Sequence, residues 1–187
     1  TPASCLLLTS AAVLGSITGS FLGAWAWRHT RGRSITRGFS ACPACAVRLR
    51  PRDLIPVLSW LLLHGRCRAC GAKISWRYPI TEAVTAALFV AVAAHDGLSP
   101  LLAPHFLLVG VLVLVSAVDL EERIVPDAVV VPASAVGLPL MILLAEGRWW
   151  QWPAAGLAAA AGLLAIATAY RLTRGREAEP AVERARW

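Results

Sequence analysis

The sequence predicts an all-α polytopic membrane protein with about five transmembrane helices and one polar insert. Of its 187 residues, 57% are hydrophobic and only 16% are charged, whereas soluble domains carry about 25% charged residues. The apolar residues also come in long blocks, which is the pattern expected where the bilayer is the solvent. The polar insert stands out because it holds four of the five cysteines.

The first transmembrane helix is expected in residues 1–27. The apolar block from Cys5 to Trp27 has about the length, roughly 20 residues, that a helix needs to cross a bilayer. Gly15, Gly19 and Gly23 follow one another at every fourth position, a spacing typical of helices that pack closely. A cleaved signal peptide is the alternative, but no charged segment precedes the block and arginines follow it.

Two Cys-x-x-Cys pairs mark the insert, residues 28–78. Cys42 and Cys45 form the first pair, and Cys67 and Cys70 form the second, with 21 residues between the pairs. This spacing is typical of a closed structural zinc site, in which each pair forms a tight knuckle and four thiolates complete a tetrahedron. Two disulfides are the alternative interpretation, and they require an oxidising compartment.

Positive charge predicts the orientation in the membrane. Alternating spans place residues 28–78, 119–126 and 171–187 on one side, with 17 of the 18 Lys and Arg residues; only Arg148 lies on the other side. By the positive-inside rule that side is the cytoplasm, a reducing compartment that favours zinc over disulfides. The net charge of +7 would suit nucleic acid, but the basic residues lie between and after apolar blocks, so we expect no nucleic-acid partner.

Residues 79–172 are expected to supply membrane helices 2–5. The first of these apolar blocks runs from Pro79 to Ala94, and the last runs from Pro153 to Leu172. A charged cytoplasmic tail, residues 173–187, follows the last block.

Carboxylates at the membrane edge are the candidate functional groups. Asp119 follows an apolar block, and an ionisable residue there is costly and a functional candidate. The alternative is an Asp that marks the helix end, solvated by headgroup water. Asp127 follows Pro126, where it would also suit the first turn of the next helix through the helix dipole. Glu121 and Glu122 are expected to form a solvated link that would attract a basic ligand.

Aspartyl protease chemistry requires two carboxylates, one to activate water and one to polarise the scissile carbonyl. Asp119 and Asp127 are a formal pair, but they flank one short link that contains Pro126. The residues alone therefore do not define a catalytic dyad.

Six segments together carry a family resemblance, which covers roughly residues 15–130: Gly19–Leu22, Cys42–Cys45, Asp53–Leu61, Gly65–Gly71, Ile74–Glu82 and Asp119–Asp127. They resemble the type IV prepilin leader peptidase family (prepilin peptidase / N-methyltransferase), the membrane aspartyl enzymes that process type IV prepilins and type II secretion pseudopilins. In this resemblance Asp119 matches the first catalytic aspartate, and Asp127 matches an aspartate with a supporting role.

The resemblance implies a multi-pass enzyme of the bacterial inner (plasma) membrane, with the zinc insert in the cytoplasm. Its partners would be the lipid bilayer and the basic leader peptides of prepilins or pseudopilins, which it would cut after a Gly. Many members then N-methylate the new N-terminus with S-adenosylmethionine. The sequence shows no Gly-rich nucleotide loop of recognisable type that would place this cofactor.

The sequence departs from the family pattern at the second catalytic aspartate, which lies in a Gly-x-Gly-Asp motif. No such motif occurs in the sequence, and Glu179 and Glu183 lack the neighbouring glycines. We therefore expect a form that is truncated before this motif and inactive by itself, with both glutamates in a solvated tail. The alternative function is a non-catalytic membrane adaptor whose zinc module binds a partner in pilus or secretion assembly.

Overall fold

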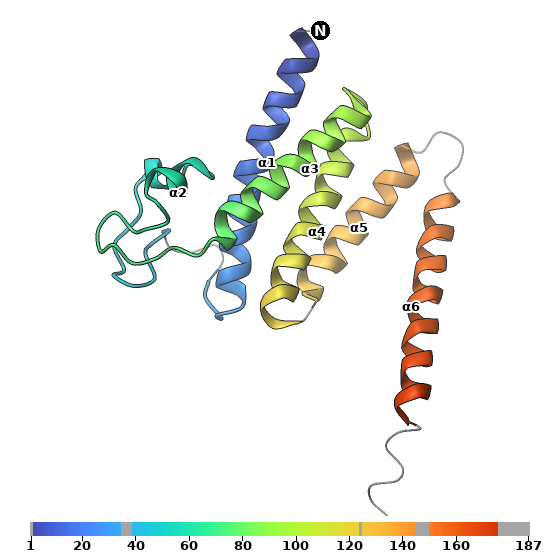
Figure 1. Cartoon of the computed structure of the whole chain (residues 1–187). Coiled ribbons are helices and arrows are strands. Elements are labelled where there is room, and N and C mark those ends of the chain that lie inside the picture. The colour runs from blue at the N-terminus through green and yellow to red at the C-terminus, as the bar shows by residue number, and fades with distance from the viewer. Residues whose placement is uncertain (1, 35–38, 124, 145–149, 176–187) are drawn as a thin grey trace, which may run out of the picture. The chain divides into compact units, whose positions relative to one another are not determined.

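The fold is all-α over the part of the chain that the structure describes. The computed structural model describes residues 2–34, 39–123, 125–144 and 150–175, with the backbone alone at 152, 163, 166–167 and 169–175. Its elements in chain order are α1 (Pro2–His29), η1 (Pro51–Leu54), α2 (Leu58–Leu62), α3 (Arg77–Asp96), α4 (Leu102–Glu122), α5 (Asp127–Leu144) and α6 (Gln151–Gly175) (Figure 1). The extended pairing among these residues consists of two isolated bridges in the insert, so the predicted all-α class is confirmed.

Four of the described helices, α1, α3, α4 and α5, are long and apolar enough to cross a bilayer. They make the chain a multi-pass membrane protein. The fifth expected span corresponds to α6, whose described apolar stretch, Pro153–Gly162, is shorter than the other four. Most of the expected tail, residues 176–187, lies outside the described residues.

The chain divides into two compact units, Thr1–Gly137 and Leu138–Trp187. The first unit holds the insert, α1, α3, α4 and the start of α5. Within it, α1 ends, α3 begins, α4 ends and α5 begins on the side from which the insert extends (Figure 1). Asp119 and Asp127 therefore lie on the same side of the membrane bundle as the four cysteines.

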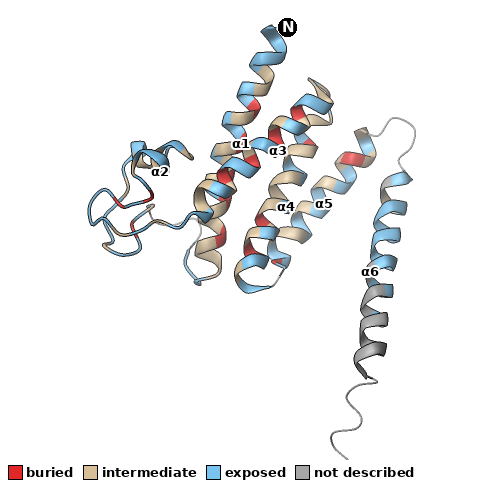
Figure 2. Ribbon diagram, viewed as in Figure 1, coloured by how far each residue is buried: buried red, intermediate tan, exposed pale blue. Residues whose placement is uncertain are grey.

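Close contact between α1 and α3 forms the centre of the first unit. A methyl group added at Gly19 would lie 2.8 Å from the Thr85 hydroxyl oxygen and 2.9 Å from the Glu82 Cα, and one at Gly15 would lie 2.8 Å from the Ala86 Cα. Thr85 is fully buried, and buried residues follow the contact along both helices (Figure 2). The predicted close packing is confirmed at Gly15 and Gly19, because only glycine lets the two backbones approach this closely.

A small apolar cluster fixes α4 against α1 just before Asp119. Leu22 and Ala26 of α1 pack with Leu114 and Val118 of α4, and Val129 of α5 joins them. Val118 is fully buried. Because neighbouring residues on a helix point in directions about 100° apart, burial of Val118 turns the next residue, Asp119, away from the cluster.

The helix ends opposite the insert are joined by both apolar and polar contacts. The ring of Phe89 in α3 stacks on that of Phe106 in α4, with centroids 4.2 Å apart. Asp96, at the end of α3, contacts Nδ1 of His95 at 2.8 Å and Nδ1 of His105 at 2.6 Å. These contacts hold the α3–α4 hairpin at the end remote from Asp119.

Gly19→Ala should destabilise the bundle, whereas Gly23→Ala should have little effect. The first methyl group overlaps Thr85 and Glu82, while the second would meet Tyr78 at 3.8 Å, an ordinary contact distance. Overpacking of this kind costs about 1–3 kcal/mol. Thermal unfolding of both full-length variants in the same detergent measures the difference, and equal melting temperatures would contradict the packing described here.

Candidate active site and metal centre

The two cysteine pairs fold into matching knuckles. The Cys42 N–H donates to the Val47 carbonyl at 3.0 Å, and the Cys67 N–H donates to the Ala72 carbonyl at 2.8 Å. The residue after each pair, Ala46 or Gly71, donates back to the carbonyl of the first cysteine at 2.9 Å. One isolated bridge closes each knuckle, Ala41 with Arg48 and Arg66 with Lys73.

The knuckles bring all four thiol sulfurs together. Every pair of these sulfur atoms lies within 4.8 Å, and Cys42 Sγ lies 3.8 Å from Cys70 Sγ. Two thiolates at adjacent corners of a zinc tetrahedron with bonds of about 2.3 Å would be about 3.8 Å apart. All four cysteines are free thiols, so the donor set and its geometry fit a tetrahedral zinc ion.

Hydrogen bonds to sulfur act differently on two of the four thiols. The backbone N–H groups of Cys45 and Ala44 lower the pKa of Cys42 from 9.0 to about 7, against the opposing effect of burial. At Cys70 the Ala72 N–H acts to lower the pKa, but hydrogen bonds with the neighbouring thiols and burial outweigh it and raise the pKa to about 11. Because a thiolate is the form that coordinates metal, the backbone of the first knuckle favours binding at Cys42.

Contacts with η1 and α2 hold the second knuckle in place. Arg68, between Cys67 and Cys70, donates from Nε to the Asp53 carboxylate of η1 at 2.8 Å. Trp60 of α2 donates from its indole nitrogen to the Ile74 carbonyl at 3.2 Å. Burial acts to raise the pKa of Asp53, but hydrogen bonds from Arg68 and the Arg50 N–H outweigh it and hold this pKa below its usual value. The insert is therefore tied together by a few polar contacts and the cysteine cluster.

Glu82 joins the insert to the membrane bundle. It is a buried residue of α3, and its Oε2 accepts the Val57 N–H at 2.6 Å. Val57 has φ 60° and ψ −51°, and the Leu58 N–H bonds the Pro56 carbonyl across it, which makes a γ-turn of the rare, strained kind. A β-branched residue strongly disfavours positive φ, so the Glu82 contact stabilises a conformation that the local sequence opposes.

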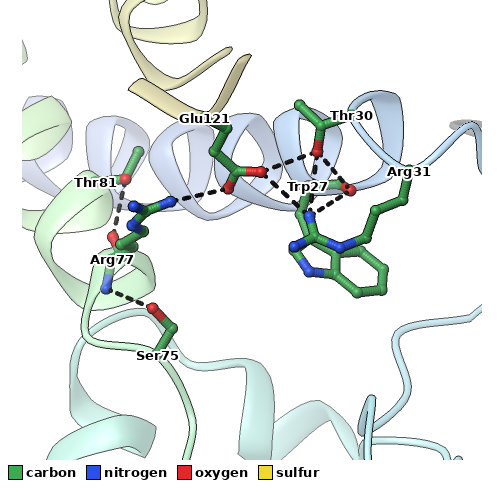
Figure 3. A network of polar contacts seen from close by, with 7 residues as sticks. All are labelled: Trp27, Thr30, Arg31, Ser75, Arg77, Thr81 and Glu121. Carbon is green, nitrogen blue, oxygen red and sulfur yellow. Dashed lines mark hydrogen bonds and ion pairs between the residues drawn. The ribbon is translucent and has the colours of Figure 1, made fainter. Parts of the chain in front are cut away.

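Glu121 anchors the end of α4, contrary to the prediction of a solvated link. Its carboxylate accepts from the Thr30 hydroxyl at 2.9 Å and from Arg31 at 3.2 Å, and it pairs with Arg77 at 3.5 Å. Figure 3 shows this carboxylate between the end of α1 and the start of α3. The prediction failed because a charge count along the sequence does not show which basic residues the fold brings alongside. Glu122 is exposed, as expected.

Asp119 lies in the last turn of α4, two residues before this anchor. Its side chain is exposed, and its carbonyl accepts the N–H of Arg123, which ends the helix in the left-handed conformation at φ 56°. Asp127 begins α5 and is also exposed. Within the described part of the chain, neither carboxylate forms a hydrogen bond or ion pair, so both are open to a ligand.

The structure gathers the four predicted cysteines into one cluster and places Asp119 and Asp127 at adjoining helix ends (Figure 1). Glu179 and Glu183 lie outside the described residues. Sequence reasoning missed the roles of Asp53, Glu82 and Glu121. The available signal was weak. Glu82 is a single acidic residue at the start of an apolar block, so its burial is energetically costly, but the sequence does not identify the group that it contacts.

Comparison with known proteins matches both halves of the chain. Residues 13–95 match the Bacterial Peptidase A24 N-terminal domain, and residues 106–175 match the Type IV leader peptidase family. The fold and these matches define a membrane protein of the peptidase type. The chain belongs to the type IV prepilin leader peptidase family.

Several curated relatives carry the name prepilin leader peptidase/N-methyltransferase. That of Myxococcus xanthus is 41% identical over 128 residues, which cover 68% of this chain and 38% of the relative. That of Bacillus subtilis is 35% identical over 167 residues, covering 87% and 64%, and that of Pseudomonas putida is 33% identical over 195 residues, covering 91% and 67%. The chain thus spans about two fifths to two thirds of these relatives. No solved structure matches the chain.

The purified chain should carry about one zinc ion, because four thiolates in this geometry fill its coordination shell. Cys42→Ser should lower the zinc content sharply. Cys5→Ser is the matched control, because Cys5 is exposed in α1 and should leave the zinc content unchanged. Elemental mass spectrometry measures both; equal zinc in the two variants would refute the proposed ligand set.

The two knuckles should respond in opposite ways to a change at the same position. Ala46 and Gly71 both have positive φ, 57° and 69°, and a left-handed conformation costs an L-residue about 1 kcal/mol relative to glycine. Ala46→Gly should therefore raise the chelator concentration that removes half the zinc. Gly71→Ala should lower it, although open space surrounds that position. Shifts of the chelator concentration in the same direction would show that backbone strain at these two positions does not determine how tightly the knuckles hold zinc.

Proposed function

We propose that this chain is a membrane aspartyl endopeptidase that cleaves the basic leader peptides of type IV prepilins or type II secretion pseudopilins, with Asp119 as a catalytic residue. The observation that carries the proposal is the exposed Asp119 carboxylate in the last turn of α4, inside the region that matches the Type IV leader peptidase family. The relatives' name gives a prepilin leader peptidase activity for those proteins.

The mechanism requires two carboxylates, and Asp119 supplies one of them; the second, which the family resemblance places in a Gly-x-Gly-Asp motif, is not identified in this sequence. One carboxylate accepts a proton from water, whose oxygen bonds to the scissile carbonyl carbon while the other, protonated carboxyl donates to the carbonyl oxygen. The C–N bond then breaks as the leaving nitrogen takes up a proton. Burial of Val118 and the Glu121 contacts hold the helix end, so Asp119 is presented on a fixed support. We assign Asp127 a supporting role.

The negative charge at the end of α4 suits the binding of a basic leader peptide. Glu122 is exposed beside Asp119, whereas Glu121 is already paired with Arg31 and Arg77. A positively charged leader would therefore meet Glu122 and Asp119 and not the occupied Glu121. Cleavage after a Gly fits an enzyme that must bring its carboxylates close to the substrate backbone.

The remaining parts of the proposal concern orientation and cofactors. Charge favours an orientation with the insert, residues 28–78, in the cytoplasm, and membership of the family favours the bacterial inner membrane as its location. Zinc bound by the four cysteines would have a structural role, as in other closed four-thiolate sites. N-methylation of the new N-terminus with S-adenosylmethionine is included because the relatives' name contains N-methyltransferase.

Asp119→Asn should abolish whatever processing of a prepilin is found in membranes that contain this chain and no other prepilin peptidase. Asn keeps the shape of the side chain but cannot accept the proton from water. Ser116→Ala is the matched control, an exposed position about one turn earlier in α4, and it should keep the unsubstituted rate. Immunoblotting separates the precursor from the processed pilin.

The outcomes test the role of Asp119 and the activity of this form. Processing that depends on Asp119 supports the peptidase and contradicts the expectation that this form is inactive by itself. Processing that survives Asp119→Asn would remove Asp119 from the mechanism. Absence of processing by the unsubstituted chain, although it is present in the membrane, agrees with a peptidase that lacks its second carboxylate and with the adaptor function alike.

A further inference from the structure

The insert exposes a continuous apolar stretch that no described part of the chain covers. Residues 54–63 contain no charged side chain, and five of their large apolar side chains are exposed: Leu54, Ile55, Leu58, Leu61 and Leu62. Leu62 is the most open of them, at 67%. Contiguous exposed apolar surface of this kind marks a binding site for a partner or a membrane.

Basic residues flank the stretch on both sides. Arg50 and Arg52 precede it, Arg66 and Arg68 follow it, and all four are exposed. Trp76, which is 62% exposed, lies at the boundary between the insert and α3. An apolar segment bordered by arginines and tryptophan has the composition of a segment in the headgroup layer of a bilayer.

The fold places this stretch next to the membrane. The insert leaves α1 at His29 and enters α3 at Arg77, so both of its ends are fixed at the membrane edge. The Glu82 contact with the Val57 N–H then ties the middle of the stretch to the second turn of α3. In Figure 1, α2 lies beside the α1–α3 pair and not beyond the last turn of α1.

We propose that residues 54–63 form an interfacial anchor that inserts into the headgroup and upper acyl region of the leaflet where α1 ends and α3 begins. The leucines of α2 would enter the acyl boundary. Arg50, Arg52 and Arg66 would bind anionic lipid phosphates, each contributing electrostatic attraction near the surface, whereas Arg68 is already paired with Asp53. Charge complementarity favours an anionic bilayer over the apolar helix of another protein, because such a helix would leave these three arginines without a counter-charge.

Such an anchor has a mechanical consequence. The chain on either side of the insert and the Glu82 contact attach it to the bundle, and a further attachment to the leaflet would restrict the zinc knuckles to the membrane surface. A substrate in the same membrane would then meet the insert in one orientation. This inference does not depend on peptidase activity.

Benzophenone crosslinking of the full chain tests the anchor. The photoreactive p-benzoylphenylalanine replaces Leu58, Leu61 or Leu62, one position at a time, in vesicles that contain phosphatidylglycerol. Val47 is the matched control: it is apolar, belongs to the same insert, and is 49% exposed, the same as Leu58. After illumination, intact-protein mass spectrometry detects a phospholipid adduct, and gel electrophoresis detects a protein adduct.

The anchor predicts several-fold more phospholipid adduct at Leu58, Leu61 and Leu62 than at Val47. It also predicts that Arg50→Gln with Arg52→Gln lowers the yield in phosphatidylglycerol vesicles but has little effect in vesicles of phosphatidylcholine alone. Equal lipid adduct at Leu58 and Val47 would overturn the proposal. Crosslinks from Leu61 or Leu62 to a protein in place of lipid, in native membranes, would overturn it in favour of a protein partner.

Discussion

One buried carboxyl group holds the two parts of the first unit together. Glu82 lies in α3 at one of the close approaches of α1, since a side chain at Gly19 would meet the Glu82 Cα at 2.9 Å. From there its Oε2 accepts the Val57 N–H of the insert at 2.6 Å. The close contact at Gly19 thus fixes the position of Glu82, and the hydrogen bond that Glu82 accepts stabilises the strained turn at Val57. A buried N–H without this partner would cost about 1–3 kcal/mol.

The insert and the bundle are stabilised by different means. In the bundle, side chains pack between helices, as in the cluster around Val118. Within the described part of the insert the buried apolar residues are Cys42 and Cys67, so the proposed metal crosslink would take the place of an apolar core. The Glu121 contacts with Arg31 and Arg77 join three helix ends beside Asp119. The proposed catalytic residue therefore depends on contacts that do not themselves touch a substrate.

The sequence predicted what local patterns determine. Hydropathy predicted the all-α membrane class, glycine spacing predicted close packing of the first helix without its partner, and cysteine spacing predicted the thiol cluster, because each follows from a short-range pattern. The tertiary partners of charged residues were not predictable: Glu121 meets Thr30 across 91 positions of the chain, and Glu82 meets a backbone N–H that carries no sequence signal. The positive φ of Val57 contradicts its residue type, so only the fold reveals it.

The most direct test of this account is hydrogen–deuterium exchange of the full chain in vesicles, comparing Glu82→Ala with Glu82→Gln. Gln keeps an acceptor oxygen for the Val57 N–H, and Ala removes it. The account predicts that peptides covering residues 55–60 exchange faster in Glu82→Ala than in Glu82→Gln, while the knuckles at 42–48 and 67–73 stay protected in both. Identical exchange of residues 55–60 in the two variants would contradict the claim that Glu82 joins the insert to the bundle.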